Sequence, residues 1–159
     1  MPQFHLIDRD AATFADLPLF VQGYVEAMFW TEDAPGVDTE EFLTDEYQEA
    51  MAEGQCDGTI PGDVGFNELH PDFLATILRE CETFQKENAA DLAEAYDRDG
   101  YTPERAGHDY WLTRNGHGTG FWDRDELDAD GLGDRLSDAA RYSEVNLWFD
   151  PDTRTVREM

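Results

Sequence analysis

Apolar residues recur every three or four positions between residues 16 and 30, which is the spacing of one face of an α-helix. These positions are Phe20, Val21, Tyr24, Val25 and Met28. Asp16 is a suitable N-cap and Pro18 suits the first helical turn. Gly23 interrupts the pattern, because glycine weakens the interior of a helix. The pattern predicts a core helix here, followed by a loop over residues 31–38.

A second helix is predicted to open at Asp38, since Glu41 three residues later completes a pattern similar to a capping box. Its apolar side is sparse and consists of Phe42, Tyr47 and Met51. Its acidic side is dense and consists of Glu40, Glu41, Asp45, Glu46, Glu49 and Glu53. The Gly- and Asp-rich stretch 54–67 is predicted to be a long loop, and such loops are often functional or mobile.

The longest helical pattern begins at Pro71. Its apolar stripe consists of Phe73, Leu74, Ile77, Leu78, Cys81 and Phe84. A break is expected near Asn88, after which Leu92 and Tyr96 extend the stripe. Gly100 is a helix stop signal.

After Gly107 the apolar period changes to two, which indicates strands. Residues 109–114 and 119–123 are predicted to pair, followed by a short helix over 134–142. A strand over 144–149, a turn over 150–153 and an edge strand over 154–157 complete the pattern. The sequence therefore predicts a single α+β domain over residues 1–159. Its N-terminal helices (about 1–100) would pack on a small antiparallel sheet in a β-rich part (about 107–159).

Asn115 and Gly116 separate the two predicted strands. Asn-Gly is a strong hairpin signal, because a type I′ turn needs a positive φ at both central positions. A turn centred there would pair Arg114 with His117. A four-residue turn over 115–118 is the alternative, and it would place His117 at the tip.

The same register would place Trp111 opposite Gly120. An aromatic ring laid across a strand glycine covers bare backbone. The glycine is therefore expected to make room for the ring rather than to serve catalysis.

Two interpretations of His117 stay open at this stage. In the functional one it acts as a general base or ligand, in a candidate catalytic set with Arg114, Asn115 and Asp123. In the structural one, Arg114 and His117 form a half-exposed pair at a turn. His108 and Asp123 would lie at the far end of the hairpin, roughly 20 Å away at about 3.3 Å per residue. A catalytic site would thus need partners from elsewhere in the chain.

No nucleotide-binding glycine loop, HExxH motif or GxSxG elbow occurs in the sequence. Cys56 and Cys81 lack the spacing of a redox or zinc motif. We therefore expect no cofactor and no metal, and the sequence favours a binding protein over an enzyme.

The strongly negative charge of the chain limits the kinds of molecule that it can bind. The chain has 37 Asp plus Glu against 11 Lys plus Arg, a formal net charge of −26. Such self-repulsion must be offset by screening or by a cationic partner. Since no basic run occurs, direct binding to nucleic acid or to an anionic membrane is disfavoured. Ten of the eleven cationic residues are arginine, which is typical of a GC-rich genome or of a proteome adapted to high salt.

The first ten residues lack the basic and apolar regions of a signal peptide, so we expect none. No apolar run approaches the roughly 20 residues of a membrane span. A cytoplasmic protein with reduced cysteines is the expectation.

The segments GHDYWLTRNGHGTGFWDR (107–124) and GLGDRLSDAARYSEVNLWF (131–149) resemble a group of small uncharacterised proteins encoded by bacteriophages, prophages and plasmids. The group shares a WLTRNGHGxGFWDR-like signature, a helix with Gly-Asp-Lys-Leu or Gly-Asp-Arg-Leu, and a final strand. The upstream segments GYVEAMFW (23–30) and LRECETFQKENAADL (78–92) are also similar to it. The resemblance implies a mobile genetic element as the source, and a host cytoplasm as the location. This chain carries an additional DELDAD after Arg124.

Four hypotheses follow. In the first, the acidic helix face binds a basic surface of a host protein, as a DNA mimic or inhibitor. In the second, the chain is a small hydrolase-like enzyme that uses Arg114 and His117. In the third, Tyr110, Trp111 and Trp122 stack single-stranded bases. In the fourth, the acidity is an adaptation to salt. The charge favours the first.

Overall fold

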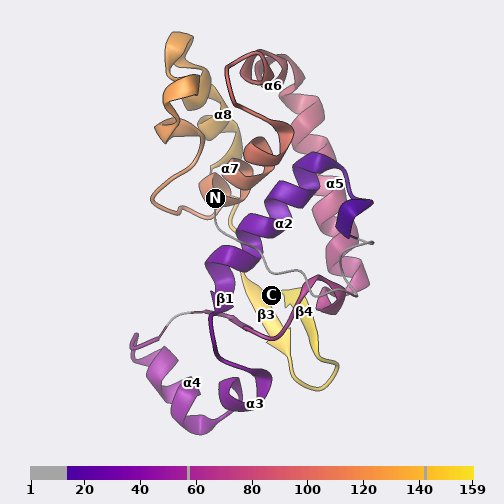
Figure 1. Cartoon of the computed structure of the whole chain (residues 1–159), viewed down its shortest axis with the longest axis vertical. Coiled ribbons are helices and arrows are strands. Elements are labelled where there is room, and N and C mark those ends of the chain that lie inside the picture. The colour runs from indigo at the N-terminus through magenta and orange to yellow at the C-terminus, as the bar shows by residue number, and fades with distance from the viewer. Residues whose placement is uncertain (1–13, 57, 142) are drawn as a thin grey trace.

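The computed structural model describes residues 14–56, 58–141 and 143–159 (Figure 1). The first ten residues, in which we expect no signal peptide, lie outside this part. In the described part of the chain, no helix combines the length and the apolar character needed to cross a membrane.

Helix α2 (Leu19–Glu32) runs through the centre of the molecule between α5 (Pro71–Glu87) and α7 (Pro103–Arg114) (Figure 1). It confirms the helix predicted over residues 16–30, but its N-cap is Pro18 and not Asp16. All five predicted apolar positions are buried, and further residues of the same helix are buried beside them. Because neighbouring helices lie on both sides of α2, the helix is buried on most of its circumference.

The crossing of α2 and α7 requires two glycines. A Cβ atom on Gly23 would lie 1.9 Å from the carbonyl oxygen of Glu104, and one on Gly107 would lie 1.8 Å from that of Phe20. These distances are far inside van der Waals contact. Gly23 therefore serves close approach of the two backbones, which offsets the cost of a glycine inside a helix.

The predicted acidic helix is two short helices, α3 (Thr39–Phe42) and α4 (Asp45–Ala52). The Asp38 carboxylate accepts a hydrogen bond from the backbone N–H of Glu41, which confirms the expected cap. A second cap, Thr44, accepts from the backbone N–H of Tyr47 and starts α4. The stretch 54–67 is mostly irregular, as expected. It also contains the short strand β2 (Ile60–Pro61), which pairs in parallel with β1 (Asp33–Ala34).

Residues 71–100 have the structure that the sequence predicts. Helix α5 begins at Pro71, and Asn88 separates it from α6 (Ala89–Tyr96). Gly100 adopts a positive φ of 76° beyond the end of α6. A short 3-10 helix, η1 (Phe66–Glu68), precedes α5.

The C-terminal elements confirm the α+β fold. Helix α8 (Leu132–Ala140) is followed by β3 (Leu147–Asp150) and β4 (Thr155–Glu158), which pair antiparallel with Phe149 opposite Val156. Between the two strands, the Asp150 carboxylate accepts a hydrogen bond from the backbone N–H of Asp152 at 3.0 Å and so shapes the predicted turn. Val156 also accepts a backbone hydrogen bond from His70, which ties the hairpin to the start of α5.

The hairpin predicted over residues 109–123 is wrong. Residues 109–114 belong to helix α7, and residues 121–123 form a 3-10 helix, η2 (Phe121–Asp123). Two further 3-10 helices, η3 (Asp125–Leu127) and η4 (Ala129–Gly131), lead into α8. The part of the chain from 107 to 140 is thus mainly helical, and the β-rich part is confined to β3 and β4.

The physical reason lies at both ends of α7. Its N-terminus is capped by Thr102, whose hydroxyl accepts a hydrogen bond from the backbone N–H of Arg105. Asn115 and Gly116 end the helix instead of turning a hairpin: Gly116 has φ +68°, and the N–H of His117 bonds back to the carbonyl of Leu112. These are the bonds of a Schellman motif, which uses the same residue types as a type I′ turn.

The interior of α7 gave no helical signal because residues 106–114 are all buried. Because this helix buries polar as well as apolar residues, its apolar residues form no single stripe with a period of 3.6. Without that period, the aromatic residues before Asn-Gly suit a strand as well as a helix.

Candidate functional site

Arg114, the central residue of the predicted catalytic set, links several elements of the fold. Its guanidinium is 5% exposed and donates to the Tyr24 hydroxyl (3.0 Å), the Glu80 carboxylate (2.7 Å) and the backbone carbonyl of Ser143 (2.9 Å). It also lies 5.0 Å from the centre of the Tyr110 ring. These bonds join α7 to α2, to α5 and to the segment after α8, and they use Nε and Nη1 of the guanidinium.

Asn115 and Asp123 also have structural roles. The Asn115 amide donates to the carbonyl of Trp111 and accepts from the backbone N–H of Val145, which closes the end of α7. Asp123 accepts from the backbone N–H of Gly120 and from the Thr119 hydroxyl. Its pKa is lowered by these bonds, with burial acting in the opposite direction.

His117 does share a cavity of about 210 Å³ with Arg114, although not as a cross-strand partner. Its Nε2 is buried and has no hydrogen-bond partner within the described residues. Arg114 lines this cavity, whereas Asn115 and Asp123 do not, so the four residues of the predicted set do not all meet around this imidazole.

The proposed stacking platform is wrong, because two of its three rings are in the core. Trp111 is 0% exposed and donates from its indole N–H to the Thr31 hydroxyl at 2.7 Å. Tyr110 is 6% exposed and stacks on Phe84 with ring centres 4.2 Å apart. Trp122 alone of the three is exposed. The expected cover of Gly120 by Trp111 is also wrong: the side chain that faces Gly120 is Thr113.

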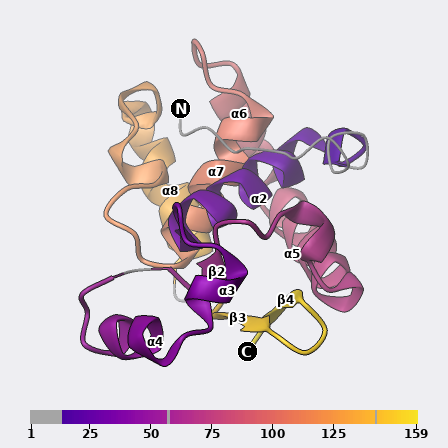
Figure 2. The same cartoon turned by 60° about the horizontal axis from the view of Figure 1, so that its bottom comes forward.

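The acidic surface is defined here by six carboxylates on α3 and α4. All six are exposed: Glu40, Glu41, Asp45, Glu46, Glu49 and Glu53. Figures 1 and 2 show α4 at the periphery of the molecule in both views. Residues 38–53 contain no lysine, arginine or histidine.

Aromatic contacts attach α3 and α4, which carry the acidic surface, to the rest of the protein. Phe42 is buried, and its ring contacts that of Tyr47 at 5.3 Å and that of Phe149 in β3 at 6.1 Å. Helix α4 itself buries no residue fully. The unit is therefore attached through its sparse apolar side, and its carboxylates face solvent.

Most cations in the described part of the chain are already paired within the protein. Lys86 and eight arginines each lie within 4.0 Å of an Asp or Glu carboxylate. Arg79 bonds to Thr76 instead. One of these pairs, Arg154 with Asp63, borders α3, where Arg154 also donates to the Thr39 hydroxyl. The unpaired charge on the molecule is consequently negative.

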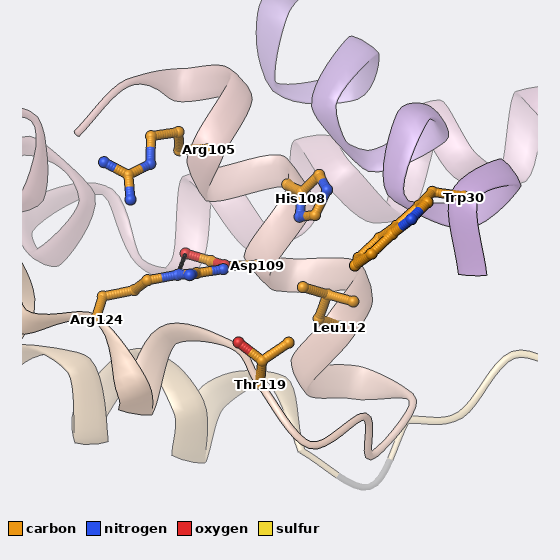
Figure 3. Close-up of a pocket in the computed structure, with 7 residues that line it drawn as sticks. All are labelled: Trp30, Arg105, His108, Asp109, Leu112, Thr119 and Arg124. Atoms are coloured by element: carbon orange, nitrogen blue, oxygen red, sulfur yellow. Dashed lines mark hydrogen bonds and ion pairs between the residues drawn. The ribbon is translucent and has the colours of Figure 1, made fainter. Parts of the chain in front are cut away.

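A second place of interest is a cavity of about 370 Å³ between the end of α2, helix α7 and the segment 119–124 (Figure 3). It is lined by Trp30, Arg105, His108, Asp109, Leu112, Thr119 and Arg124. The four lining residues from α7 lie at positions i, i+3, i+4 and i+7, which is one face of that helix. This spacing was present in the sequence, but the strand assignment concealed it.

The polar centre of this cavity is an ion pair. Arg124 donates from Nε and Nη2 to the carboxylate of Asp109, at distances from 2.6 to 3.1 Å. The Tyr101 hydroxyl donates to the same carboxylate at 2.8 Å. Burial raises the pKa of Asp109, while Arg124 and Tyr101 act in the opposite direction. Asp109 thus fixes the orientation of the Arg124 guanidinium.

His108 lies beside this pair and is buried. Its ring centre is 5.7 Å from that of Trp30, with 32° between the ring planes. Burial and the positive charges of Arg124 and Arg105 lower the pKa of His108 to about 4, so the imidazole is neutral at pH 7. Within the described residues, its Nε2 has no hydrogen-bond partner.

Among the residues that the structure describes, no group of three or more His, Cys, Asp or Glu side chains is placed to hold a metal ion. Comparison with known proteins found no matching family model, no matching curated sequence and no matching solved structure.

Proposed function

We propose that this chain is a phage-type binding protein that docks its acidic surface on a basic, nucleic-acid-binding surface of a host protein. The observation that carries this proposal is the arrangement of residues 38–53. All six carboxylates of the acidic surface are exposed on a peripheral pair of helices without a single cation in that segment.

Two further features support it. Most of the described cations outside residues 38–53 are paired with carboxylates of their own neighbourhood. Their charge is therefore not available to neutralise the acidic surface. A field of one sign speeds association with an oppositely charged partner, and it makes that association sensitive to salt. Carboxylates on such a surface compete with phosphates for lysine and arginine side chains, which is the chemical basis of a DNA mimic.

The test is a capture experiment with a matched charge control. The acidic-surface variant carries Glu40→Gln, Glu41→Gln, Glu46→Gln and Glu49→Gln. The control variant changes four exposed carboxylates elsewhere and carries Asp97→Asn, Asp99→Asn, Asp125→Asn and Asp152→Asn. Both variants have the same net charge.

Each protein is immobilised and exposed to a nuclease-treated bacterial lysate at 50 mM and 500 mM salt, and bound proteins are identified by mass spectrometry. We expect basic proteins that bind the native chain and the control at low salt but not the acidic-surface variant. A purified candidate should then be displaced from its own DNA by the native chain. Equal loss in both variants would show that net charge alone is responsible, and would overturn the proposal.

The same proteins distinguish salt adaptation from binding. If the native chain is unfolded at 50 mM salt and folds only in molar salt, the acidity serves solvation in a salt-rich cell. If it is folded at 50 mM salt, the adaptation hypothesis loses its physical basis.

A further inference from the structure

The cavity around His108 differs in charge from the rest of the molecule. Its charged lining side chains are two guanidiniums, Arg105 and Arg124, and one carboxylate, Asp109. Glu126 pairs with Arg105 from beside the lining, so two carboxylates balance the two guanidiniums in a chain whose formal net charge is −26. A small anion would meet less repulsion here than elsewhere on the surface.

The cation at its centre is oriented in advance. Asp109 holds Arg124 through Nε and Nη2, and no described residue accepts a hydrogen bond from Nη1. The two N–H groups on Nη1 therefore remain as donors at a fixed position. Arg105 is also held, because it donates to the carbonyl of Gly100 and pairs with Glu126.

His108 adds an unsatisfied polar group. Only 7% of the residue is exposed, and its Nε2 lacks a partner within the described part of the chain. A buried polar group without a hydrogen bond is costly, so a ligand that pairs with the imidazole would relieve that cost. The imidazole is neutral at pH 7, so it does not compete with the arginines for Asp109.

The other side of the cavity is apolar and aromatic. Figure 3 shows the Trp30 indole and Leu112 on the side of the cavity opposite the Arg105 and Arg124 side chains. Trp30 is 48% exposed, so its indole has free surface on this side. A flat ring would cover it, and stacked aromatic pairs contribute beyond the area that they bury.

We propose that this cavity binds a small aromatic or heteroaromatic monocarboxylate, with its carboxylate at Arg124 and His108 and its ring against Trp30 and Leu112. A volume of about 370 Å³ lies within the usual range of small-molecule sites and accommodates a single or fused ring. The site does not use the acidic surface, so this inference is independent of the proposed protein partner.

The experiment is a titration of the full chain with benzoate and indole-3-acetate, each compared with its neutral amide and with inorganic phosphate. Binding is followed by shifts of the Trp indole and backbone N–H signals in NMR spectra. We expect saturable binding of at least one carboxylate, at least tenfold weaker binding of its amide, and the largest shifts at Trp30, Leu112 and Arg124.

Two tryptophan variants test the location. Trp30→Ala should weaken binding of the carboxylate at least tenfold, whereas Trp148→Ala, which removes an equally exposed indole on β3, should leave it unchanged. Both side chains are exposed, so neither variant should unfold the protein. His108→Asn should weaken binding and leave the signals of the acidic surface in place.

Absence of saturable binding by both carboxylates would overturn the inference, as would equal binding of acid and amide. Tighter binding of phosphate than of either carboxylate would overturn the assigned ligand class. An equal effect of Trp30→Ala and Trp148→Ala would overturn the assigned position.

Discussion

Gly23 of α2 and Gly107 of α7 lie on facing sides of one helix crossing, where each glycine meets a backbone carbonyl of the other helix. The two helices touch there through their backbones rather than through side chains. The aromatic residues that flank the crossing, Tyr24 and Tyr110, consequently come within 5.5 Å of each other, measured between ring centres.

Alanine at either glycine should therefore destabilise the protein. At an ordinary helix position Gly→Ala stabilises by about 0.5–1 kcal/mol, but here the added Cβ would force the helices apart, which costs about 1–3 kcal/mol or more. We expect Gly23→Ala and Gly107→Ala each to lower the free energy of unfolding in urea titrations by about 1–3 kcal/mol or more.

Gly118→Ala is the matched control, because no atom lies within 4 Å of the Cβ position at Gly118. We expect it to change the free energy of unfolding by less than about 0.5 kcal/mol. A stabilising effect of Gly23→Ala would show that the two backbones are not in contact.

The hydrogen bonds of Arg114 to Tyr24 and Glu80 lead to a second prediction about stability. Arg114→Ala would leave Glu80 and the buried Tyr24 hydroxyl without the guanidinium that they now share. Breaking a buried charge pair in this way costs about 3 kcal/mol, and lysine should restore only part of it because an ammonium cannot span three acceptors. The exposed Arg79→Ala is the control and should change stability by less than about 0.5 kcal/mol. Equal effects of both substitutions, measured by urea denaturation, would contradict a structural role for Arg114.

The elements that sequence analysis predicted well are those with one apolar face and distinct ends. Helix α5 has Pro71 at its start, a stripe of apolar residues and Asn88 at its end, and the structure reproduces all three. The β3–β4 hairpin likewise shows alternation around a turn rich in Asp and Pro. In both cases, local propensity and burial lead to the same answer.

The candidate site was predicted less well, because it depends on one misassigned helix. Asn115 and Gly116 suit a hairpin turn and a helix C-terminus equally, and the aromatic residues before them are buried on every side. Thr102 and Pro103 were the available signal for a helix start. With α7 as a strand, Arg105, His108, Asp109 and Leu112 could not be placed on one face, so the cavity was not foreseen.

We expect the stability of the protein to depend on pH through the carboxyl group of Asp33. Burial raises the pKa of this carboxyl from 3.8 to about 7, and its Oδ1 has no hydrogen-bond partner within the described residues. The folded state therefore binds the proton more tightly than the unfolded state between pH 3.8 and 7. Stability falls as pH rises through this window, because the charged carboxylate is disfavoured where it is buried.

Asp33→Asn removes that charge and should raise the melting temperature at pH 8, with a gain that shrinks as pH falls towards 4. The exposed Asp152→Asn corrects for the general relief of negative charge and should show a smaller and flatter gain. Melting curves at pH 4, 6 and 8 measure the effect. An equal gain for Asp33→Asn at pH 4 and pH 8 would contradict the raised pKa.

We expect charges at the two ends of α4 to have opposite effects on the stability of that helix. Asp45 and Glu46 lie in its first turn, where the helix dipole favours negative charge, whereas Glu49 and Glu53 lie at its C-terminal end, where the dipole opposes it. The variant Asp45→Asn with Glu46→Gln and the variant Glu49→Gln with Glu53→Gln change the net charge equally. Relief of general repulsion is therefore the same in both.

We expect the variant at the C-terminal end to be the more stable one by about 1–4 kcal/mol at low salt, because the two variants differ by four charges at about 0.3–1 kcal/mol each. The difference should shrink in 1 M salt, where the screening length is about 3 Å. Hydrogen exchange of the α4 amides measures this locally, even if α4 opens before the body of the protein. Equal exchange in both variants would show that uniform repulsion, and not the placement of charge along α4, governs the stability of the acidic surface.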